Sequence, residues 1–290
     1  MGTDFRIALM LFTVLAPAGA IAFVLMSVRI MSIVQRTPIR ERMERCLVLP
    51  IGLCLVGLIS SATHLGTPDN ALYVLAGIGR SPLSEEVLAA VVFIAISWLY
   101  WLVAFVRQIP LHVSRAFLAL ACVAAFWLVY RISTVYSIPT IPTWNSPFIP
   151  LELWSVALTS GPMVCLAIFA WMQRSFRDGE VVAPRAFYGF LVGVSFLALV
   201  VSVGLALLQN QELGVLSGSY GLASDLFPFY GASIFAFAAL GALGEVAAVL
   251  SIRKRNCPRP LGAATAVLLV ISAAIVIRVP FYTMHMTIGY

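Results

Sequence analysis

The sequence predicts an all-α, polytopic membrane protein in which eight transmembrane helices form one bundle and a single domain, residues 1–290. Hydrophobic residues make up 61% of the chain and charged residues only 10%, and the mean hydropathy is +1.01, values far from those of soluble proteins. The apolar runs are continuous and each is about long enough to cross a bilayer as a helix, whereas a β-barrel requires alternation. The short connections leave no room for a soluble domain with an active site of its own.

The eight expected helices are separated by connections that contain proline, glycine or arginine. Their expected ranges are residues 7–28, 47–64, 87–106, 116–136, 153–172, 187–208, 229–251 and 261–279. The first run has no cluster of positive charge before it and is too long for the apolar part of a cleaved signal peptide. We therefore expect it to be retained as a membrane helix.

Positive charge distinguishes the two sides of the bundle. The connections after the first, third, fifth and seventh helices hold most of the basic residues, namely Arg29, Arg36, Arg40, Arg42, Arg45, Arg107, Arg115, Arg174, Arg177, Arg185, Arg253, Lys254, Arg255 and Arg259. Because basic connections stay on the cytoplasmic side, both termini are expected on the opposite, outer face. The net charge of +6 follows from this pattern, so we expect membrane lipid and not nucleic acid as a partner.

The connections on the outer face are longer. Residues 71–78 are apolar but too few to span the membrane, which predicts a surface helix. After them, Ser81 or Ser84 followed by Glu85 and Glu86 is typical of the start of a helix.

Two further outer connections are expected to contribute to function. Residues 137–150 hold four prolines and no charge, which predicts a stiff, extended segment. Residues 209–228 mix amides, glycines and aromatic side chains. Long connections in compact proteins are usually functional, so we expect the functional site on this face.

Ionisable side chains near the membrane surface mark the candidate site, because such groups are costly in hydrocarbon. His64 ends the second helix just before Gly66 and Pro68, at the depth of a quinone headgroup. A histidine with a pKa of about 6.5 can accept one of the protons that quinol oxidation releases. The alternative is an interfacial histidine that only bonds to a neighbouring carbonyl group.

Three further ionisable residues lie at the same level. They are Arg80 before the third helix, Arg131 about one turn inside the fourth, and Glu152 at the start of the fifth. Arg131 is expected to be buried and paired, because a whole turn of helix follows it. Arg80 and Arg278 have lipid headgroups as alternative partners.

Aromatic residues also fall at this level, among them Tyr136, Trp144 and Tyr282. The ordinary interpretation of such residues is an interfacial belt.

Glu245 is the single acidic residue well inside a span, either a neutral hydrogen-bonded group or a carboxylate on a proton path. A haem bound by two histidines needs a pair that faces each other inside the bundle. Only His64 and His285 lie on one side, and His285 follows the last helix, so no haem is expected. The five cysteines lack paired spacing, so no iron–sulfur cluster is expected in this chain.

Four short motifs resemble one known family when they are taken together. They are His64-Leu65-Gly66 with Pro68, the run Ser81-Pro82-Leu83-Ser84-Glu85-Glu86, the segment Arg278 to Tyr282, and the tail His285-Met286-Thr287-Ile288-Gly289. Their order and spacing resemble the membrane anchor subunit of the dimethyl sulfoxide reductase type of molybdoenzyme. The eight-helix layout with both ends outside is similar to that family as well, and the resemblance implies a bacterial inner membrane with both termini on the periplasmic face.

The resemblance implies a haem-free anchor that oxidises menaquinol or another quinol. The electrons would pass to an iron–sulfur subunit that carries a molybdopterin catalytic subunit, and His64 would bind the quinol. Arg80, Arg131 and Glu152 are the candidates for the rest of the site. The terminal substrate is not implied, because related anchors serve several catalytic subunits.

Two alternatives stay open at this point. One is a quinone-reducing anchor of a related sulfur-compound oxidoreductase. The other is a small-solute transporter or channel, which would place polar residues at the bilayer midplane and show internal duplication.

Overall fold

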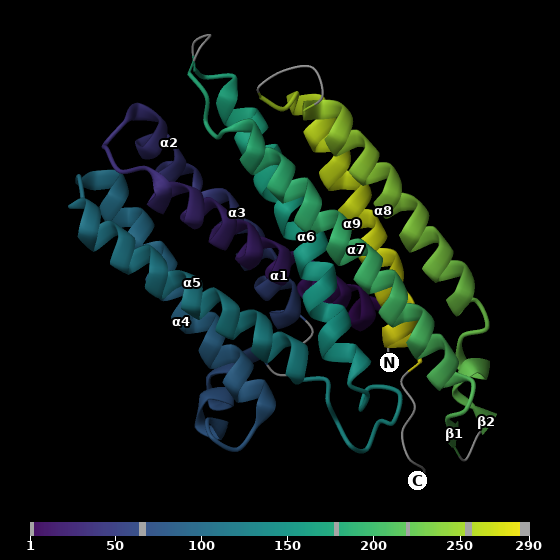
Figure 1. The fold of residues 1–290 in the computed structure, drawn as a ribbon. Helices are drawn as coiled ribbons and strands as arrows, with labels where there is room; N and C mark the ends of the chain where they lie inside the picture. The colour runs from purple at the N-terminus through teal and green to yellow at the C-terminus, as the bar shows by residue number, and fades with distance from the viewer. Residues whose placement is uncertain (1–2, 64–67, 177–179, 219–220, 253–256, 285–290) are drawn as a thin grey trace.

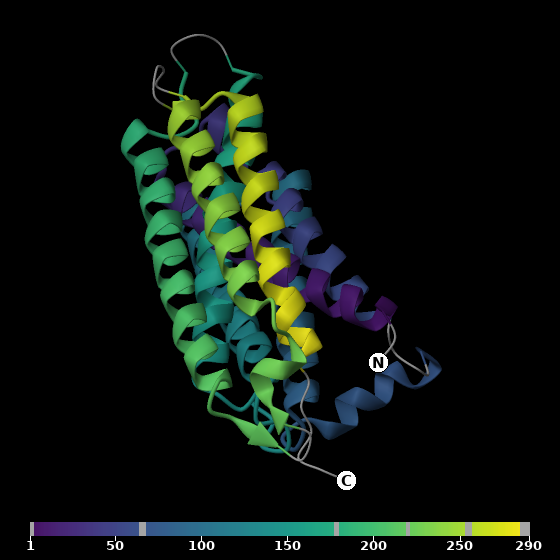
Figure 2. The same cartoon turned by 90° about the vertical axis from the view of Figure 1, so that its right-hand side faces the viewer.

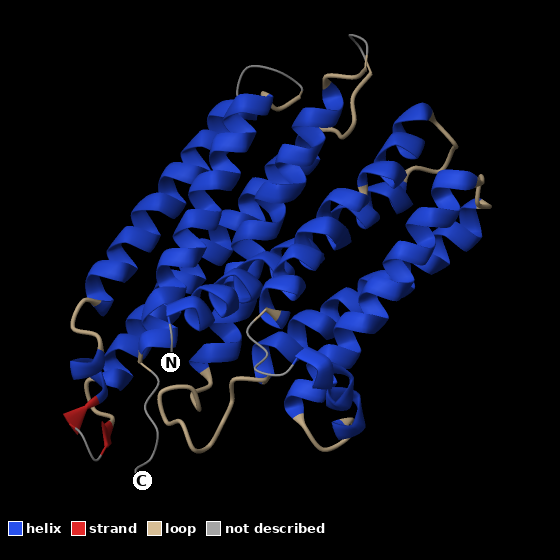
Figure 3. Cartoon of the chain, turned by 180° about the vertical axis from the view of Figure 1, so that it is seen from behind, coloured by secondary structure: helices blue, strands red, loops and turns tan. Residues whose placement is uncertain are grey.

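The computed structural model describes residues 3–63, 68–176, 180–218, 221–252 and 257–284. The helices are α1 (Thr3–Ser32), α2 (Pro38–Cys46), α3 (Val48–Ala62), α4 (Pro82–Val106), α5 (Leu111–Thr134), α6 (Phe148–Gln173), α7 (Arg185–Leu213), α8 (Tyr230–Ile252) and α9 (Pro260–Thr283). Shorter elements are the 3-10 helices η1 (Pro68–Gly77) and η2 (Ala223–Leu226) and the antiparallel pair β1 (Ser217–Gly218) and β2 (Gly221–Leu222). Figure 3 shows this pair as a small hairpin on an otherwise helical chain.

The described residues contain eight helical spans that are long and apolar enough to cross a membrane, so the expected number and order of helices are confirmed. The second span differs most from its expected range. It begins at Pro38 and includes both α2 and α3, whereas hydrophobicity alone predicts a start at residue 47. The early start has a local cause, because the Thr37 side chain accepts a hydrogen bond from the Arg40 backbone N–H and Pro38 occupies the first turn.

Two central helices organise the bundle. In the apolar parts of the spans, 78% of the residues of α1 and 83% of those of α6 are buried within the chain, against 28–50% in the other six. The helices α2 to α5 lie on one side of this centre and α7 to α9 on the other (Figure 1). In the view of Figure 2, α7, α8 and α9 lie side by side in front of the purple N-terminal helix.

Close contact between α1 and α3 depends on glycine. A Cβ atom on Gly57 would lie 2.7 Å from the backbone nitrogen of Ala16, and one on Gly19 would lie 2.6 Å from the carbonyl oxygen of Pro50. The two helices therefore touch backbone to backbone, which is a common packing mode in membranes.

The bundle has two chemically different ends. The connections between α3 and α4, α5 and α6, and α7 and α8 lie at one end, together with the start of α1 and the end of α9 (Figure 1). We call this the cavity end, for the cavity described below. The opposite end, which carries the α1–α2, α4–α5, α6–α7 and α8–α9 connections, is the arginine-rich end.

At the cavity end, the connections before α4 and α6 are folded back on the bundle. The 3-10 helix η1 confirms the short helix expected at residues 71–78, and α4 begins at Pro82 directly after Ser81, as expected. The expected extended conformation of residues 137–150 is wrong. This segment forms successive turns, with Ile141 N–H donating to the Ile138 carbonyl and Trp144 N–H to the Ile141 carbonyl, both at 2.9 Å.

The turns have an apolar cause. They place the side chains of Ile141 and Trp144 in the core, where they are 6% and 5% exposed. Burial of these two side chains outweighs the preference of proline-rich sequence for an extended chain.

A buried polar group, the Arg40 cluster, joins α2, α4 and α5 near the arginine-rich end, and Arg40 Nη1 also donates to the Ile30 carbonyl of α1 at 2.7 Å. Arg40 is 0% exposed, and its Nε lies 3.0 Å from Glu44 Oε1. Its Nη2 donates to Ser114 Oγ at 2.6 Å, and Tyr100 Oη donates to Glu44 Oε1 at 3.0 Å. The expected place of Arg40 among the charges of a connection is wrong, because Arg40 lies inside α2 and its charge is compensated within the bundle.

Candidate functional site

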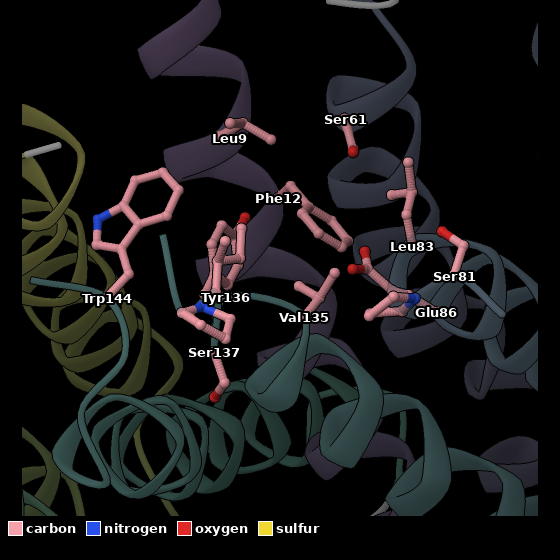
Figure 4. A pocket seen from close by; sticks show the side chains of 13 residues that line it. Leu9, Phe12, Ser61, Ser81, Leu83, Glu86, Val135, Tyr136, Ser137 and Trp144 are labelled. Atoms are coloured by element: carbon pink, nitrogen blue, oxygen red, sulfur yellow. The ribbon is translucent and has the colours of Figure 1, made fainter. Parts of the chain in front are cut away.

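A cavity of about 470 Å³ opens at the cavity end between α1, α3, the start of α4 and the segment that follows α5. It is lined by Leu9, Phe12, Ser61, Ser81, Pro82, Leu83, Glu86, Val135, Tyr136, Ser137, Ile138, Pro139 and Trp144. The lining is mainly apolar, with one carboxylate, one phenol and three serines among these residues (Figure 4).

Glu86 is the one charged residue among the described lining residues. Its side chain leaves the second turn of α4 and points into the space between Phe12 and Val135 (Figure 4). The residue is only 5% exposed, and within the described part of the chain it has no hydrogen-bond or ion-pair partner. An isolated buried carboxyl group is costly, so its position at a cavity indicates a functional role.

The neighbouring carboxylate has a different position. Glu85 accepts a hydrogen bond from the Gly79 backbone N–H at 2.7 Å and forms an ion pair with Arg131 at 3.0 Å. Glu85 therefore fixes the start of α4 to α5, and the next residue, Glu86, faces the cavity.

Tyr136 forms the wall opposite Glu86 and continues into a buried chain of hydroxyl groups. Its hydroxyl oxygen lies 2.8 Å from that of Tyr282, which in turn lies 3.2 Å from Thr13 Oγ1. Burial raises the pKa of Tyr136 well above its ordinary value, so the phenol is neutral and can act as a hydrogen-bond donor. The expected interfacial belt does not describe Tyr136, Trp144 or Tyr282, which are 7%, 5% and 1% exposed.

The two candidate arginines lie outside the lining of the cavity. Arg131 is half-buried and paired with Glu85, which confirms the expected pairing but not full burial. Arg80 is exposed in the turn before Ser81. Arg131 is thus paired with Glu85, which precedes the lining residue Glu86 in the chain. Arg80 directly precedes the lining residue Ser81.

Glu152 is buried in the first turns of α6 and faces Arg278 of α9, with 3.8 Å between Glu152 Oε2 and Arg278 Nη1. Arg278 is 0% exposed, so the alternative in which its side chain reaches lipid headgroups is wrong. Its guanidinium carbon lies 5.3 Å from the centre of the Phe281 ring, and its nitrogens have no hydrogen-bond partner among the described residues. Neither Glu152 nor Arg278 is among the described residues that line the cavity.

Glu245 lies elsewhere, in α8 against α7. Ser195 Oγ donates to Glu245 Oε1 or to the Thr159 carbonyl oxygen, the latter at 2.7 Å. Glu245 Oε2 has no partner within the described residues. This arrangement leaves both interpretations of Glu245 possible, a hydrogen-bonded group or a step of a proton path.

His64 lies outside the described residues, as does His285. The last described lining residue before it is Ser61, near the end of α3. Groups of three or more histidine, cysteine or acidic side chains suited to a metal ion do not occur in the part of the chain that the structure describes.

Glu86 is missing from the site residues expected from the sequence, because Glu85 and Glu86 together match the pattern of helix-start charges. A signal was present in the helical period. Glu86 shares one face of α4 with Ala89, Ala90 and Phe93, all buried, whereas Glu85 falls on another face. A carboxylate on a face of small and aromatic side chains points into the bundle.

The mainly apolar lining with a few polar side chains suits a small, mainly apolar molecule that carries polar atoms. The volume of the cavity is within the range of about 300–1,000 Å³ usual for small-molecule sites. Glu86 can accept a proton and Tyr136 can hold an oxygen atom by hydrogen bonding.

Comparison with known proteins gives a consistent result over nearly the whole chain. The family model of the DMSO reductase anchor subunit (DmsC) matches residues 1–284. The sequence is 30% identical to the YnfH subunit of an anaerobic dimethyl sulfoxide reductase of Escherichia coli (strain K12) over 250 residues, which are 86% of this protein and 84% of that one. It is 28% identical to the C subunit of anaerobic dimethyl sulfoxide reductase from the same organism, over 97% of this protein and 95% of that one. It is also 28% identical to the C subunit of the anaerobic dimethyl sulfoxide reductase of Haemophilus influenzae (strain ATCC 51907 / DSM 11121 / KW20 / Rd), over 98% of this protein and 96% of that one.

Proposed function

The chain belongs to the family of DMSO reductase anchor subunits, and from this we propose that it oxidises menaquinol, or another quinol, in the cavity beside Glu86. It is a multi-pass membrane anchor of a dimethyl sulfoxide reductase-type complex. The electrons pass to an iron–sulfur subunit and then to a molybdopterin catalytic subunit. The membrane is the bacterial inner membrane, with the cavity end on the periplasmic side.

The position of Glu86 in the cavity is the observation that supports this proposal most strongly. A quinol that becomes a quinone loses two electrons and two protons. The electrons leave to a cluster in the partner subunit, so the protons need acceptors within the anchor. A buried carboxylate without a partner in the described residues, at the wall of an apolar cavity, suits this role.

His64 is proposed as the second proton acceptor. In the sequence it stands three positions after Ser61, the described residue of α3 that lines the cavity. Its imidazole and the Glu86 carboxylate would each take one proton from the two quinol oxygens.

The remaining candidates have supporting roles in this proposal. Arg131 holds Glu85 and with it the start of α4, and Arg80 contributes positive charge near the cavity mouth. Glu152 with Arg278 lies on the α6–α9 side of the site. Arg80, Arg131 and Glu152 are proposed to position the quinol-binding segments or the headgroup.

Glu245 is proposed to carry protons through the α6–α7–α8 interface by way of Ser195. Glu245→Gln should then slow quinol-driven turnover and leave dye-driven turnover unchanged. Equal quinol-driven rates in this variant and the wild type would leave Glu245 as a hydrogen-bonded packing residue.

We also propose that the protein binds no haem and no iron–sulfur cluster of its own. A reduced-minus-oxidised spectrum of the purified complex tests the first part. A b-type band stoichiometric with this subunit would contradict it.

The central experiment is His64→Ala, assayed in the membrane-bound complex with two electron donors. Quinol-driven turnover should fall by about 10²- to 10⁴-fold, the usual effect of a lost general base. Turnover driven by a dye that reduces the soluble subunits directly should persist. Quinol-driven activity near that of the wild type would move the site away from His64, and loss of both activities with release of the complex would indicate a role in assembly.

A further inference from the structure

A second candidate site lies at the arginine-rich end, on the exposed side of α2. A cavity of about 240 Å³ is lined by Pro38, Glu41, Arg42, Arg45, Ser175 and Phe176. A smaller one of about 130 Å³ lies against the end of α4 and is lined by Arg36, Glu41, Arg45, Ala104, Phe105, Val106, Arg107 and Gln108. The two cavities share Arg45 and Glu41 and are therefore adjacent on α2; we refer to them together as the groove.

The charges of this groove are not neutralised inside the protein. At this end of the bundle, the ion pairs among the described residues are those of Arg36 and Arg40 with Glu44, whereas Arg42, Arg45 and Arg107 have no carboxylate partner within the described residues. Arg42 Nη2 lies 3.4 Å from Ser175 Oγ. The Arg45 guanidinium carbon lies 5.8 Å from the centre of the Phe105 ring.

One acidic residue, Glu41, also lines the groove, and its negative charge would repel an anion. Glu41 Oε1 accepts a hydrogen bond from Gln108 Nε2 at 3.3 Å. With Arg36 already paired to Glu44, the lining still holds three arginines, Arg42, Arg45 and Arg107, against this one carboxylate. The local net charge is therefore positive.

The groove also borders an apolar surface. Leu102, Phe105 and Val106 at the end of α4 are 50%, 57% and 76% exposed. Trp101 lies beside them and donates its Nε1–H to the Arg45 carbonyl oxygen at 2.8 Å. Aromatic side chains and exposed apolar residues directly below arginines are typical of the level at which lipid headgroups meet acyl chains.

We propose that this groove binds the phosphate of an anionic phospholipid, with Arg42 and Arg45 contacting the headgroup and the exposed end of α4 contacting an acyl chain. A soluble phosphate would use the arginines but not the adjoining apolar surface, which is why the observations favour a lipid. The site is separate from the quinol cavity and does not depend on the function proposed for it.

The test measures lipid retained by the purified full-length protein in a zwitterionic detergent, by native mass spectrometry during titration with phosphatidylglycerol. Each basic side chain near an anionic headgroup contributes about fivefold in affinity. Arg42→Gln with Arg45→Gln should therefore weaken phosphatidylglycerol binding roughly 25-fold. Arg185→Gln is the matched control, because Arg185 is exposed at the same end of the bundle and lines neither cavity.

Three further measurements separate the possible results. Phosphatidylcholine should be retained more weakly than phosphatidylglycerol, and equal retention would overturn the proposal. Inorganic phosphate should not displace the lipid, and full displacement would show a site for soluble anions instead. Equal phosphatidylglycerol affinity in the double variant and in Arg185→Gln would show non-specific binding.

A pair of single variants keeps the test valid in case the double variant does not fold. Arg45→Lys retains the positive charge and should keep most of the affinity, whereas Arg45→Gln should lose about fivefold. Equal binding by these two variants would also overturn the proposal.

Discussion

Replacement of Glu86 with glutamine tests the proposed site most directly. The change keeps the number of side-chain heavy atoms, so the volume of the cavity stays nearly constant. It removes the carboxylate that accepts a proton but leaves an amide that can still bond to a quinol oxygen. The expected effect is therefore on kcat of quinol oxidation and much less on KM.

The size of the effect follows from the surroundings of Glu86. Loss of a general base costs about 10²- to 10⁴-fold. Tyr136 and water that enters the open cavity provide weaker routes for the proton, so we expect the lower limit, about 100-fold, equivalent to roughly 2.7 kcal/mol in the activation free energy.

Stability should respond in the opposite direction. Glu86 is 5% exposed and has no partner among the described residues. Glutamine is a polar group as well, but it removes the additional cost of burying a charge without a counter-ion, so the free energy of unfolding should stay equal or rise in Glu86→Gln. A loss of activity together with a stable fold distinguishes a chemical role from a structural one.

The assay compares quinol-driven with dye-driven turnover of the membrane-bound complex. Glu212→Gln serves as the control, because Glu212 is an acidic residue at the same end of the bundle that bonds to Ser146 and does not line the cavity. Quinol-driven kcat within about threefold of the wild type in Glu86→Gln would refute the assignment of Glu86 as a proton acceptor.

Three other predictions concern the fold and its orientation. Gly57→Ala should destabilise the protein by about 1–3 kcal/mol, because the new Cβ would lie 2.7 Å from the Ala16 nitrogen. Gly52→Ala should be tolerated, since nothing lies within 4 Å of its Cβ position. Equal thermal unfolding of the two variants would contradict the close contact between α1 and α3. Glu44→Gln should lower the free energy of unfolding by about 3–5 kcal/mol, because it leaves the buried Arg40 guanidinium group without its counter-charge. A variant that unfolds like the wild type would show that another group compensates the charge of Arg40. A reporter fused after Tyr290 should behave as an exported protein, and strong cytoplasmic activity would reverse the proposed orientation.

Hydrophobic patterning was sufficient to predict the eight spans, because each apolar run is long and is interrupted by charge, proline or glycine. It could not predict the start of the second span. There Arg40 and Glu44 lie inside the bundle as a buried ion pair. The sequence around a charged residue does not show whether a group in the folded protein will neutralise its charge. The arginine count separates the two ends of the bundle but does not show which arginines remain free.

The candidate site was predicted less completely, for a related reason. The face and the level of the site follow from the positions of ionisable residues near the ends of the spans. The side chains that surround these ionisable residues could not be predicted, because the wall of the cavity combines α1, α3, α4 and the segment after α5. The folding of residues 137–150 into turns, which buries Trp144 and Tyr136, depends on α9, more than 100 residues away in the sequence.

The same wall has a consequence for biosynthesis. Thr13 and the carbonyl group of Leu9 emerge from the ribosome first, yet the Tyr282 hydroxyl that bonds to them belongs to the last helix. Until α9 has been inserted, Tyr136 lacks its hydroxyl partner and Trp144 lacks the Phe281 carbonyl that its indole N–H donates to. A polypeptide that stops before α9 would lack these hydrogen bonds, so the cavity wall is complete only after the whole polypeptide has been synthesised and inserted.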